Sequence, residues 1–187
     1  MNKKKFWKII KKTIVRGGAD IDERAEVLEK LLSKLKPDDI VKWQLILDEY
    51  LEVSKVDRLW AAAYLLNDGA SDDGFDYFRA WLISLGEAGF LAILEDPDLL
   101  GELLQDGIDD DFLAEFEEIM YISSDVYLEK TGEDDEEVFF QACDQLALTT
   151  DEKSAIHADI ILPEALEWDE DDDLESIFPK IARIKPE

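Results

Sequence analysis

The stretch GASDDGFDYFRAWLISLG, residues Gly69–Gly86, decides the fold, because a complete amphipathic helix can be read from it together with its start signal. Ser71 is a preferred N-cap residue, and Asp72 and Asp73 fall in the first turn, where the helix dipole favours negative charge. The apolar residues that share one face of this helix are Phe75, Phe78, Leu82 and Leu85. This spacing predicts a helix that buries that face, together with Trp81, in a hydrophobic core.

A polar face of the same helix carries a candidate binding site. Its residues are Asp72, Asp73, Asp76 and Arg79. Asp76 and Arg79 are three residues apart and can pair, and carboxylates beside a guanidinium could bind a ligand or orient a water molecule. The alternative is an ordinary helix start with a surface ion pair worth at most about 0.5 kcal/mol. Arg79 is the only basic residue between Arg58 and Lys130, so we expect it to be tied to several acids.

Helical periodicity continues through most of the sequence before residue 150. Pro37 suits the first position of a helix, while Asn67 and Gly69 tolerate the left-handed conformation that ends one. The further predicted helices are an amino-terminal one with the apolar stripe Phe6, Trp7, Ile10 and Ile14, and residues 20–36, 37–51, 56–67, 87–95, 98–105, 111–130 and 133–148. Because alternating β-branched residues are scarce, we predict an all-α, single-domain helical bundle over residues 1–150 with negligible sheet.

The segment 151–187 differs from the rest of the chain, since it contains Pro163, Pro179, Pro186 and the acidic run 169–173. These features favour an acidic, partly extended tail with short helices. The apolar residues that could anchor it are Leu166, Trp168, Ile177, Phe178 and Ile181. We expect this tail to pack along the helical domain rather than to form a second one.

Charge is the strongest global signal, because 47 acidic residues against 20 basic ones give a net charge of -27. Residues 61–179 hold 35 of the acids and only three bases. Such a field repels nucleic acids and anionic lipids and attracts basic proteins or divalent cations. We therefore expect a basic protein partner, with neither nucleic acid nor a membrane bound. The alternative is that the acids serve solubility alone.

The cellular location of the protein is predicted from its cysteine content and its apolar segments. Cys143 is the single cysteine, and no apolar run is long enough to span a bilayer. The lysines of the start, MNKKKFWKIIKK, interrupt any signal-peptide core, so we expect a cytoplasmic protein. The apolar stripe of that segment could lie on an anionic membrane, although burial in the core is the prediction we favour.

The familiar catalytic constellations are missing from the sequence. His157 is the only histidine, which with one cysteine excludes a zinc site built from these residues. No phosphate-binding glycine loop is present, and the runs 109–111 and 169–173 lack the spacing of a calcium loop. A carboxylate pair with one buried member, Asp72 or Asp73 with Asp76 or Glu118, could still act as acid and base. No catalytic residue, metal ligand or cofactor is assigned.

A family resemblance emerges from several segments together. The longest is LWAAAYLLNDGASDDGFDYFRAWLISLG, and the others are FWKII at Phe6, DPDLL at Asp96, EEIMYISSDVYLEKTG from Glu117 and, more weakly, WDEDDDLESIFPKI from Trp168. They resemble the bacterial family known as Domain of Unknown Function 4240. The resemblance implies a single domain of bacterial origin and carries no activity with it. The signature that it implies centres on Asp72, Asp73, Phe75, Tyr77, Phe78, Arg79 and Trp81.

Three functional hypotheses follow from this sequence. The first is an immunity-type inhibitor that masks a basic toxin or enzyme by charge complementarity. The second is an enzyme that uses the Asp/Arg cluster, and the third is a structural or adaptor domain. A protein partner needs an anchor, for which Trp168, Tyr121 and Tyr127 are the candidates, although both tyrosines could instead be core residues.

Overall fold

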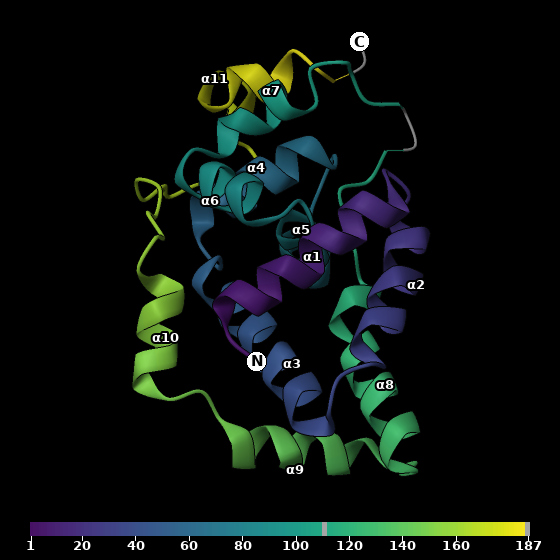
Figure 1. The fold of residues 1–187 in the computed structure, drawn as a ribbon. Helices are drawn as coiled ribbons and strands as arrows, with labels where there is room; N and C mark the ends of the chain where they lie inside the picture. The colour runs from purple at the N-terminus through teal and green to yellow at the C-terminus, as the bar shows by residue number, and fades with distance from the viewer. Residues whose placement is uncertain (110–111, 186–187) are drawn as a thin grey trace.

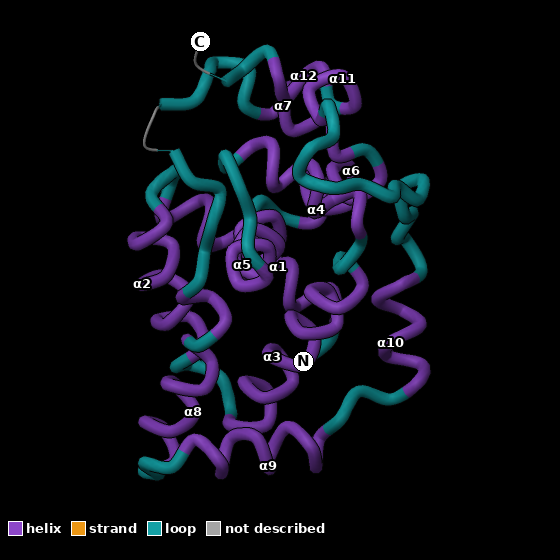
Figure 2. The backbone as a smooth tube through the Cα atoms, turned by 180° about the vertical axis from the view of Figure 1, so that it is seen from behind, coloured by secondary structure: helices purple, strands orange, loops and turns teal. Residues whose placement is uncertain are grey.

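Helices account for all the regular secondary structure in this computed structural model, which describes residues 1–109 and 112–185 and has no strand in those ranges (Figures 1 and 2). The α-helices are α1 Lys3–Gly17, α2 Ile21–Leu32, α3 Pro37–Val53, α4 Asp57–Leu66, α5 Asp72–Ser84, α6 Glu87–Glu95, α7 Leu100–Leu103, α8 Ile122–Thr131, α9 Glu136–Leu146, α10 Thr150–His157, α11 Leu174–Ile177 and α12 Pro179–Ala182. Two short 3-10 helices are η1 Pro97–Leu99 and η2 Glu118–Met120. The prediction of an all-α fold is confirmed.

The centre of the fold is α3, which contacts α1, α5, α8, α9 and α10 (Figure 1). Pro37 occupies its first turn, as the sequence predicts, since proline has no N–H to leave unsatisfied there. Trp43 and Leu47 of this helix are fully buried. In Figure 1, α2 and α8 lie on one side of α3, α10 lies on the other, and α9 closes the base.

The amino-terminal helix α1 buries its apolar stripe in the core, as predicted. Phe6 and Ile10 have no exposed surface, and Phe6 stacks on Tyr50 with ring centroids 5.6 Å apart. The Trp7 Nε1–H donates a 2.8 Å hydrogen bond to the Tyr50 hydroxyl. The indole nitrogen is thus satisfied inside the core, where an unpaired donor would be costly.

The helix α5 follows its sequence closely. The Ser71 side chain accepts a hydrogen bond from the Gly74 N–H, which makes Ser71 the N-cap. Phe78 is fully buried and Trp81 is 6% exposed, so their predicted core position is confirmed.

The carboxyl-terminal helices complete the core at the far end of the molecule. Phe178 and Ile181 are fully buried, and α12 packs on α4 and α7. The Asp98 carboxylate accepts hydrogen bonds from the backbone N–H groups of Lys180 and Ile181. At Gly101 the two backbones come so close that an added Cβ would lie 2.1 Å from the Lys180 carbonyl carbon. The tail is therefore held by packing and by backbone hydrogen bonds.

The predicted helix over residues 111–130 is wrong in its first part. Residues 112–117 form a loop, and regular α-helix starts at Ile122, after η2. Ala114 and Phe116 are buried in this loop, where the Ala114 N–H donates to the Asn67 side chain and the Phe116 N–H donates to the Tyr77 carbonyl. These tertiary contacts replace helical hydrogen bonds that the local pattern favoured. Residues 110–111 of the acidic run 109–111 lie outside the described residues.

Candidate functional site

Arg79, the centre of the predicted polar site, lies inside the protein. Its side chain is 5% exposed and donates hydrogen bonds to the Leu51 carbonyl and the Asp76 carboxylate. Its guanidinium lies over the Phe75 ring, 4.8 Å from the centroid. Burial lowers the pKa of Arg79, while the nearby charge of Asp76 opposes that shift. This guanidinium joins α5 to the end of α3 and does not face solvent.

The three acids of the predicted site, Asp72, Asp73 and Asp76, do not form a cluster around Arg79. Asp72 and Asp73 are exposed in the first turn of α5, and Asp76 is half-exposed above Arg79. None of these acids lines the cavities described below, and Arg79 holds one carboxylate where several were expected. The arrangement fits the structural interpretation of the motif, in which charged residues cap and brace a helix.

A pocket of about 400 Å³ lies instead between α4 and the tail, where Trp168 stands. Its lining consists of Asp57, Trp60, Tyr64, Ala70, Leu166, Glu167, Trp168 and Glu170. We call it the Trp168 pocket. Asp57, Trp60 and Tyr64 are spaced at i, i+3 and i+7, which brings all three to one face of α4. The Trp168 ring meets the Tyr64 ring with centroids 5.3 Å apart.

Behind the pocket, Trp60 is held rigidly by α5. Its ring stacks on Phe75 with centroids 5.0 Å apart and an interplanar angle of 7°, and its Nε1–H donates a 3.0 Å hydrogen bond to the Ala70 carbonyl. Phe75 in turn carries the Arg79 guanidinium. The buried cation, the phenyl ring and the indole thus form one stack that supports the pocket wall.

The electrostatics of the Trp168 pocket favour a cation. Its charged lining residues are the three exposed acids Asp57, Glu167 and Glu170. The faces of its three aromatic rings carry the negative part of the ring quadrupole. The nearby Arg58 is not part of this lining; it borders an adjoining depression, and its guanidinium lies 5.5 Å from the centroid of the Phe178 ring. A positively charged side chain from outside would meet both carboxylates and aromatic faces.

Two further depressions continue from the pocket. One, of about 390 Å³, shares Tyr64 and Glu170 with it and adds the acids Asp68, Asp172, Asp173 and Glu175, with Lys185, which pairs with Asp68, as its one base. Another, of about 310 Å³, shares Asp57 and Leu166 with the pocket, and its other charged lining residues are Lys55, Arg58 and Glu164, so its acids and bases are balanced. We call the Trp168 pocket and the first of these depressions together the acidic track. It follows the tail along α4, so an extended segment of a partner would meet several acids in turn.

The sequence of one known protein family matches most of this chain. The family described as protein of unknown function (DUF4240) matches residues 1–129. The chain belongs to this family. No curated protein and no solved structure matches the chain. The DUF4240 region includes α4 and α5, and hence Trp60, Tyr64 and Arg79, whereas Trp168 and Glu170 lie beyond it. One wall of the Trp168 pocket therefore belongs to the DUF4240 region and the other is supplied by the tail.

The two tyrosines proposed as anchors lie within the DUF4240 region, away from this pocket. Tyr121 is 50% exposed just before α8. Tyr127 is half-buried, with its ring centroid 5.3 Å from that of Phe139. Neither lines the Trp168 pocket. Of the three proposed anchors, Trp168 is the one that lines a cavity described here.

Two residues of the pocket were missed as site residues by sequence reasoning. Trp60 and Tyr64 read as ordinary apolar positions of a DUF4240 helix, but both are only half-buried. The signal that could have found them is the acidic Asp57 one turn before two aromatics on the same helical face.

Over residues 1–109 and 112–185, no group of three or more His, Cys, Asp or Glu side chains is placed to hold a metal ion. Burial raises the pKa of the Cys143 thiol to about 11, so this cysteine is a poor nucleophile. His157 Nε2 lies 2.8 Å from the Glu49 carboxylate, which fixes α10 to α3. None of the helices described is long and apolar enough to cross a membrane.

Proposed function

We propose that the protein is a binding domain for a basic protein, which it recognises through the Trp168 pocket and the acidic track. The observation that carries this proposal is the pairing of three aromatic rings with three carboxylates in one pocket. Cation-binding sites in proteins are built from these two kinds of group. The chain's net charge of -27 adds long-range attraction for such a partner.

The energetics suit one lysine or arginine side chain of the partner in the pocket. A cation over an aromatic face is worth about 0.5 kcal/mol at an exposed site and about 2 kcal/mol when it is desolvated. Asp57, Glu167 and Glu170 are exposed, so each adds only a fraction of a kcal/mol after screening by water and salt. Trp168 is thus the expected hot spot, and the acids set specificity and the association rate.

The finer form of the proposal is an immunity-type inhibitor. An inhibitor of a basic toxin or enzyme needs to cover the active surface quickly and leave no free enzyme, and charge complementarity raises association rates toward the diffusion limit. The acidic track supports this form, because it offers a series of acids to an extended basic surface. The alternative, a structural or adaptor domain, shares the same binding face but blocks no activity.

An enzymatic role for Asp72, Asp73, Asp76 and Arg79 has less support. The Arg79 guanidinium donates to the Leu51 carbonyl and the Asp76 carboxylate inside the protein, whereas Asp72 and Asp73 are exposed at a helix start. A reacting substrate needs a cavity beside the groups that act on it. These four residues frame none of the cavities described above.

The experiment is capture of the partner from source cells at low salt, followed by binding kinetics with the purified partner. We expect a basic protein whose association rate falls as the salt rises from 0.01 to 0.15 M, where the Debye length shortens from about 30 to about 8 Å. Trp168→Ala should weaken the complex at least about ten-fold, which corresponds to about 1.4 kcal/mol.

Tyr121→Ala and Phe140→Ala are the matched controls, since both side chains are exposed aromatics outside the pocket. They should bind as tightly as the wild type. Normal binding by Trp168→Ala would remove the pocket from the proposal, and an association rate that ignores salt would remove its electrostatic part. Inhibition of the partner's activity separates the immunity-type inhibitor from the adaptor.

A further inference from the structure

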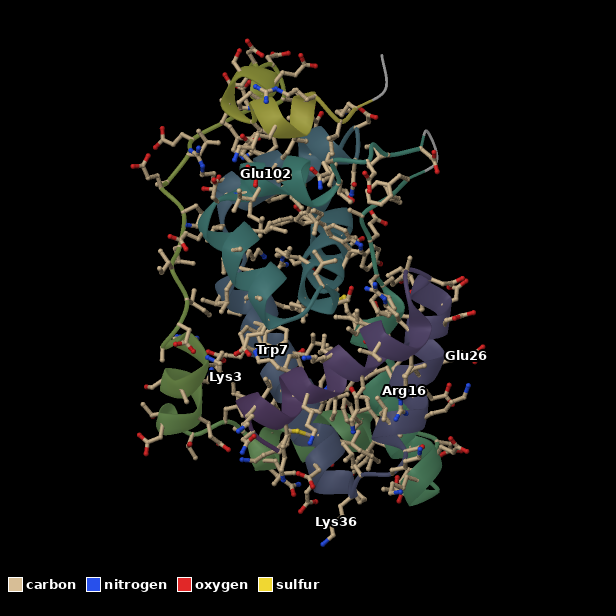
Figure 3. The ribbon with its side chains drawn as sticks, turned by 45° about the horizontal axis from the view of Figure 1, so that its top comes forward. Lys3, Trp7, Arg16, Glu26, Lys36 and Glu102 are labelled. Carbon is tan, nitrogen blue, oxygen red and sulfur yellow. The ribbon has the colours of Figure 1, made fainter. Side chains whose placement is uncertain are left out.

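A second surface has the opposite charge to the rest of the molecule. Helix α1 carries seven Lys and Arg residues and no acid, in a chain of net charge -27. Lys3 is bound to Asp159 near the end of α10 (Figure 3). Lys4, Lys8, Lys11 and Arg16 are exposed and make no ion pair within residues 1–109 and 112–185. These four cations therefore lack an acidic partner among the described residues, although the chain is rich in acids.

These lysines border a groove of about 1020 Å³ between α1 and the turn that leads into α6, which we call the α1–α6 groove. Its apolar lining includes Trp7, Ile14 and Leu85, and Val15 at its edge is 75% exposed. Glu87 is the one acid in its lining. The groove is larger than the Trp168 pocket and lies within the family-matched residues 1–129.

The walls of the α1–α6 groove are fixed by specific contacts. Trp7 presents carbon to the groove, because its N–H is already bonded to the Tyr50 hydroxyl. Gly86 has φ +94°, a conformation that other residues rarely adopt, and a Cβ there would lie 3.3 Å from the Ile14 Cδ1. Glycine therefore lets the turn approach α1 closely while leaving the groove open.

The spacing of its cations indicates the shape of the ligand. Lys4, Lys8 and Lys11 are spaced at i, i+4 and i+7, so they form a row of about 10 Å along the helix axis. Glutamates at i, i+4 and i+7 on a partner helix would form a row of the same length, so each could pair with one of these lysines. An amphipathic helix that lies in a groove uses apolar residues at this same period as anchors.

We propose that the α1–α6 groove binds an acidic amphipathic helix of a partner protein. Its apolar residues pack on Trp7, Ile14 and Val15, and its carboxylates pair with the exposed lysines. The proposal is independent of the Trp168 pocket, which accepts the opposite charge. A domain with both surfaces can hold a basic and an acidic partner together.

Two other anionic ligands fit less well. A fatty acid gains affinity by burying most of its surface, which an open groove does not provide. A bilayer is too flat to reach the groove floor at Trp7 and Ile14.

The test is selection from a displayed library of helical peptides with random residues on one face. We expect a consensus with apolar residues at i, i+4 and i+7 flanked by Asp or Glu. The dissociation constant of a synthetic consensus peptide should rise at least ten-fold for Lys8→Glu/Lys11→Glu. The control Lys34→Glu/Lys36→Glu makes the same charge change at two exposed lysines outside the groove, and Figure 3 shows Lys36 at a distance from Trp7. It should bind like the wild type.

Several results would overturn the proposal. The selection could yield no helical binder or a basic consensus, or the Lys8→Glu/Lys11→Glu variant could bind the acidic peptide normally while folded by circular dichroism. Sedimentation of the wild type, but not this variant, with phosphatidylglycerol vesicles would assign the face to a membrane. Displacement of the peptide by palmitate would assign it to a fatty acid. Trp168→Ala must leave binding of the acidic peptide unchanged, which separates this result from the fate of the proposed function.

Discussion

The guanidinium of Arg79 lies 4.8 Å from the centroid of the Phe75 ring, on α5, while Trp60 of α4 stacks on that same ring. A cation, a phenyl ring and an indole are thus stacked from the end of α3 outward to the Trp168 pocket. Arg79 was predicted to line a binding site. In the structure it lies behind Phe75 and Trp60 and supports the wall of the Trp168 pocket. Replacing Arg79 should therefore lower the stability of the fold.

Arg79→Ala should lower the free energy of unfolding by about 2–4 kcal/mol, because it removes the buried hydrogen bond to the Leu51 carbonyl, the ion pair with Asp76 and the contact with Phe75. Asp76→Asn should cost about 1 kcal/mol at most, since the Asp76 side chain is 42% exposed. Urea unfolding followed by circular dichroism measures both. A stability within 0.5 kcal/mol of wild type for Arg79→Ala would contradict the structural role.

Phe78→Ala should cost about 3–5 kcal/mol, because the ring is fully buried and packs on Trp81 with centroids 5.7 Å apart. This loss is a large share of the stability of an ordinary domain. Phe140→Ala is the control, since that side chain is 56% exposed. Similar unfolding midpoints for the two variants would mean that Phe78 is not a core residue.

Gly101→Ala should destabilise the closure of the tail on α7. The added Cβ would meet the Lys180 backbone at 2.1 Å, and backbone cannot swing aside as a side chain can, so the cost is expected at about 1–3 kcal/mol. Gly89→Ala serves for comparison, because its Cβ would meet only the Leu85 Cβ, at 3.2 Å, within a helix. Limited proteolysis should cut Gly101→Ala near residue 174 faster than either wild type or Gly89→Ala. Equal rates would argue against the close approach.

Acid should weaken the attachment of α10. Hydrogen bonds from Lys42 and from the Thr149 cap lower the pKa of Glu152 to about 2, against about 4.3 in an unfolded chain. A carboxyl whose pKa is lower in the folded state contributes stability above the unfolded pKa and loses it as the pH falls toward the folded one. That contribution should be about 1 kcal/mol after solvent screening, and it should fade between about pH 4.5 and 2.

Glu152→Gln should therefore be less stable than wild type at pH 6 and equally stable near pH 2, as measured by urea titration at each pH. The comparison is made between the two proteins at the same pH, because protonation of the many other carboxyl groups affects both alike. A difference that persists unchanged to pH 2 would show that the charge of Glu152 is not the cause.

The helices of this protein could be predicted where local chemistry decides them. Ser71 as an N-cap and Pro37 in a first turn mark helix starts that the structure reproduces. Residues 112–117 were mistaken for helix because Ala114 and Phe116 give a helical apolar pattern, yet their backbone finds partners on Asn67 and Tyr77. Asn67 caps the end of α4 and Tyr77 lies in α5, so these partners are distant in sequence and a local pattern cannot predict them.

The candidate site shows the same limit. Trp168 could be proposed as an anchor because it stands among acids, but its neighbours Trp60 and Tyr64 are more than 100 residues away in sequence. The charge of Arg79 was visible in the sequence, whereas its burial depends on how α5 crosses the end of α3. The sequence pattern thus predicted which residue types are important. Which of these residues contact one another depends on the fold.

The close contact of Gly101 with Lys180 also has a consequence for how the protein is made. Phe178 and Ile181 fill the core beside α4 and α7, so a nascent chain cannot finish this end of the molecule until both residues have left the ribosome. At synthesis rates of about 5–20 residues per second, α4 waits several seconds with its apolar face uncovered. Chaperones therefore have a defined interval in which to act, and messages truncated before residue 178 should give chains that proteases remove.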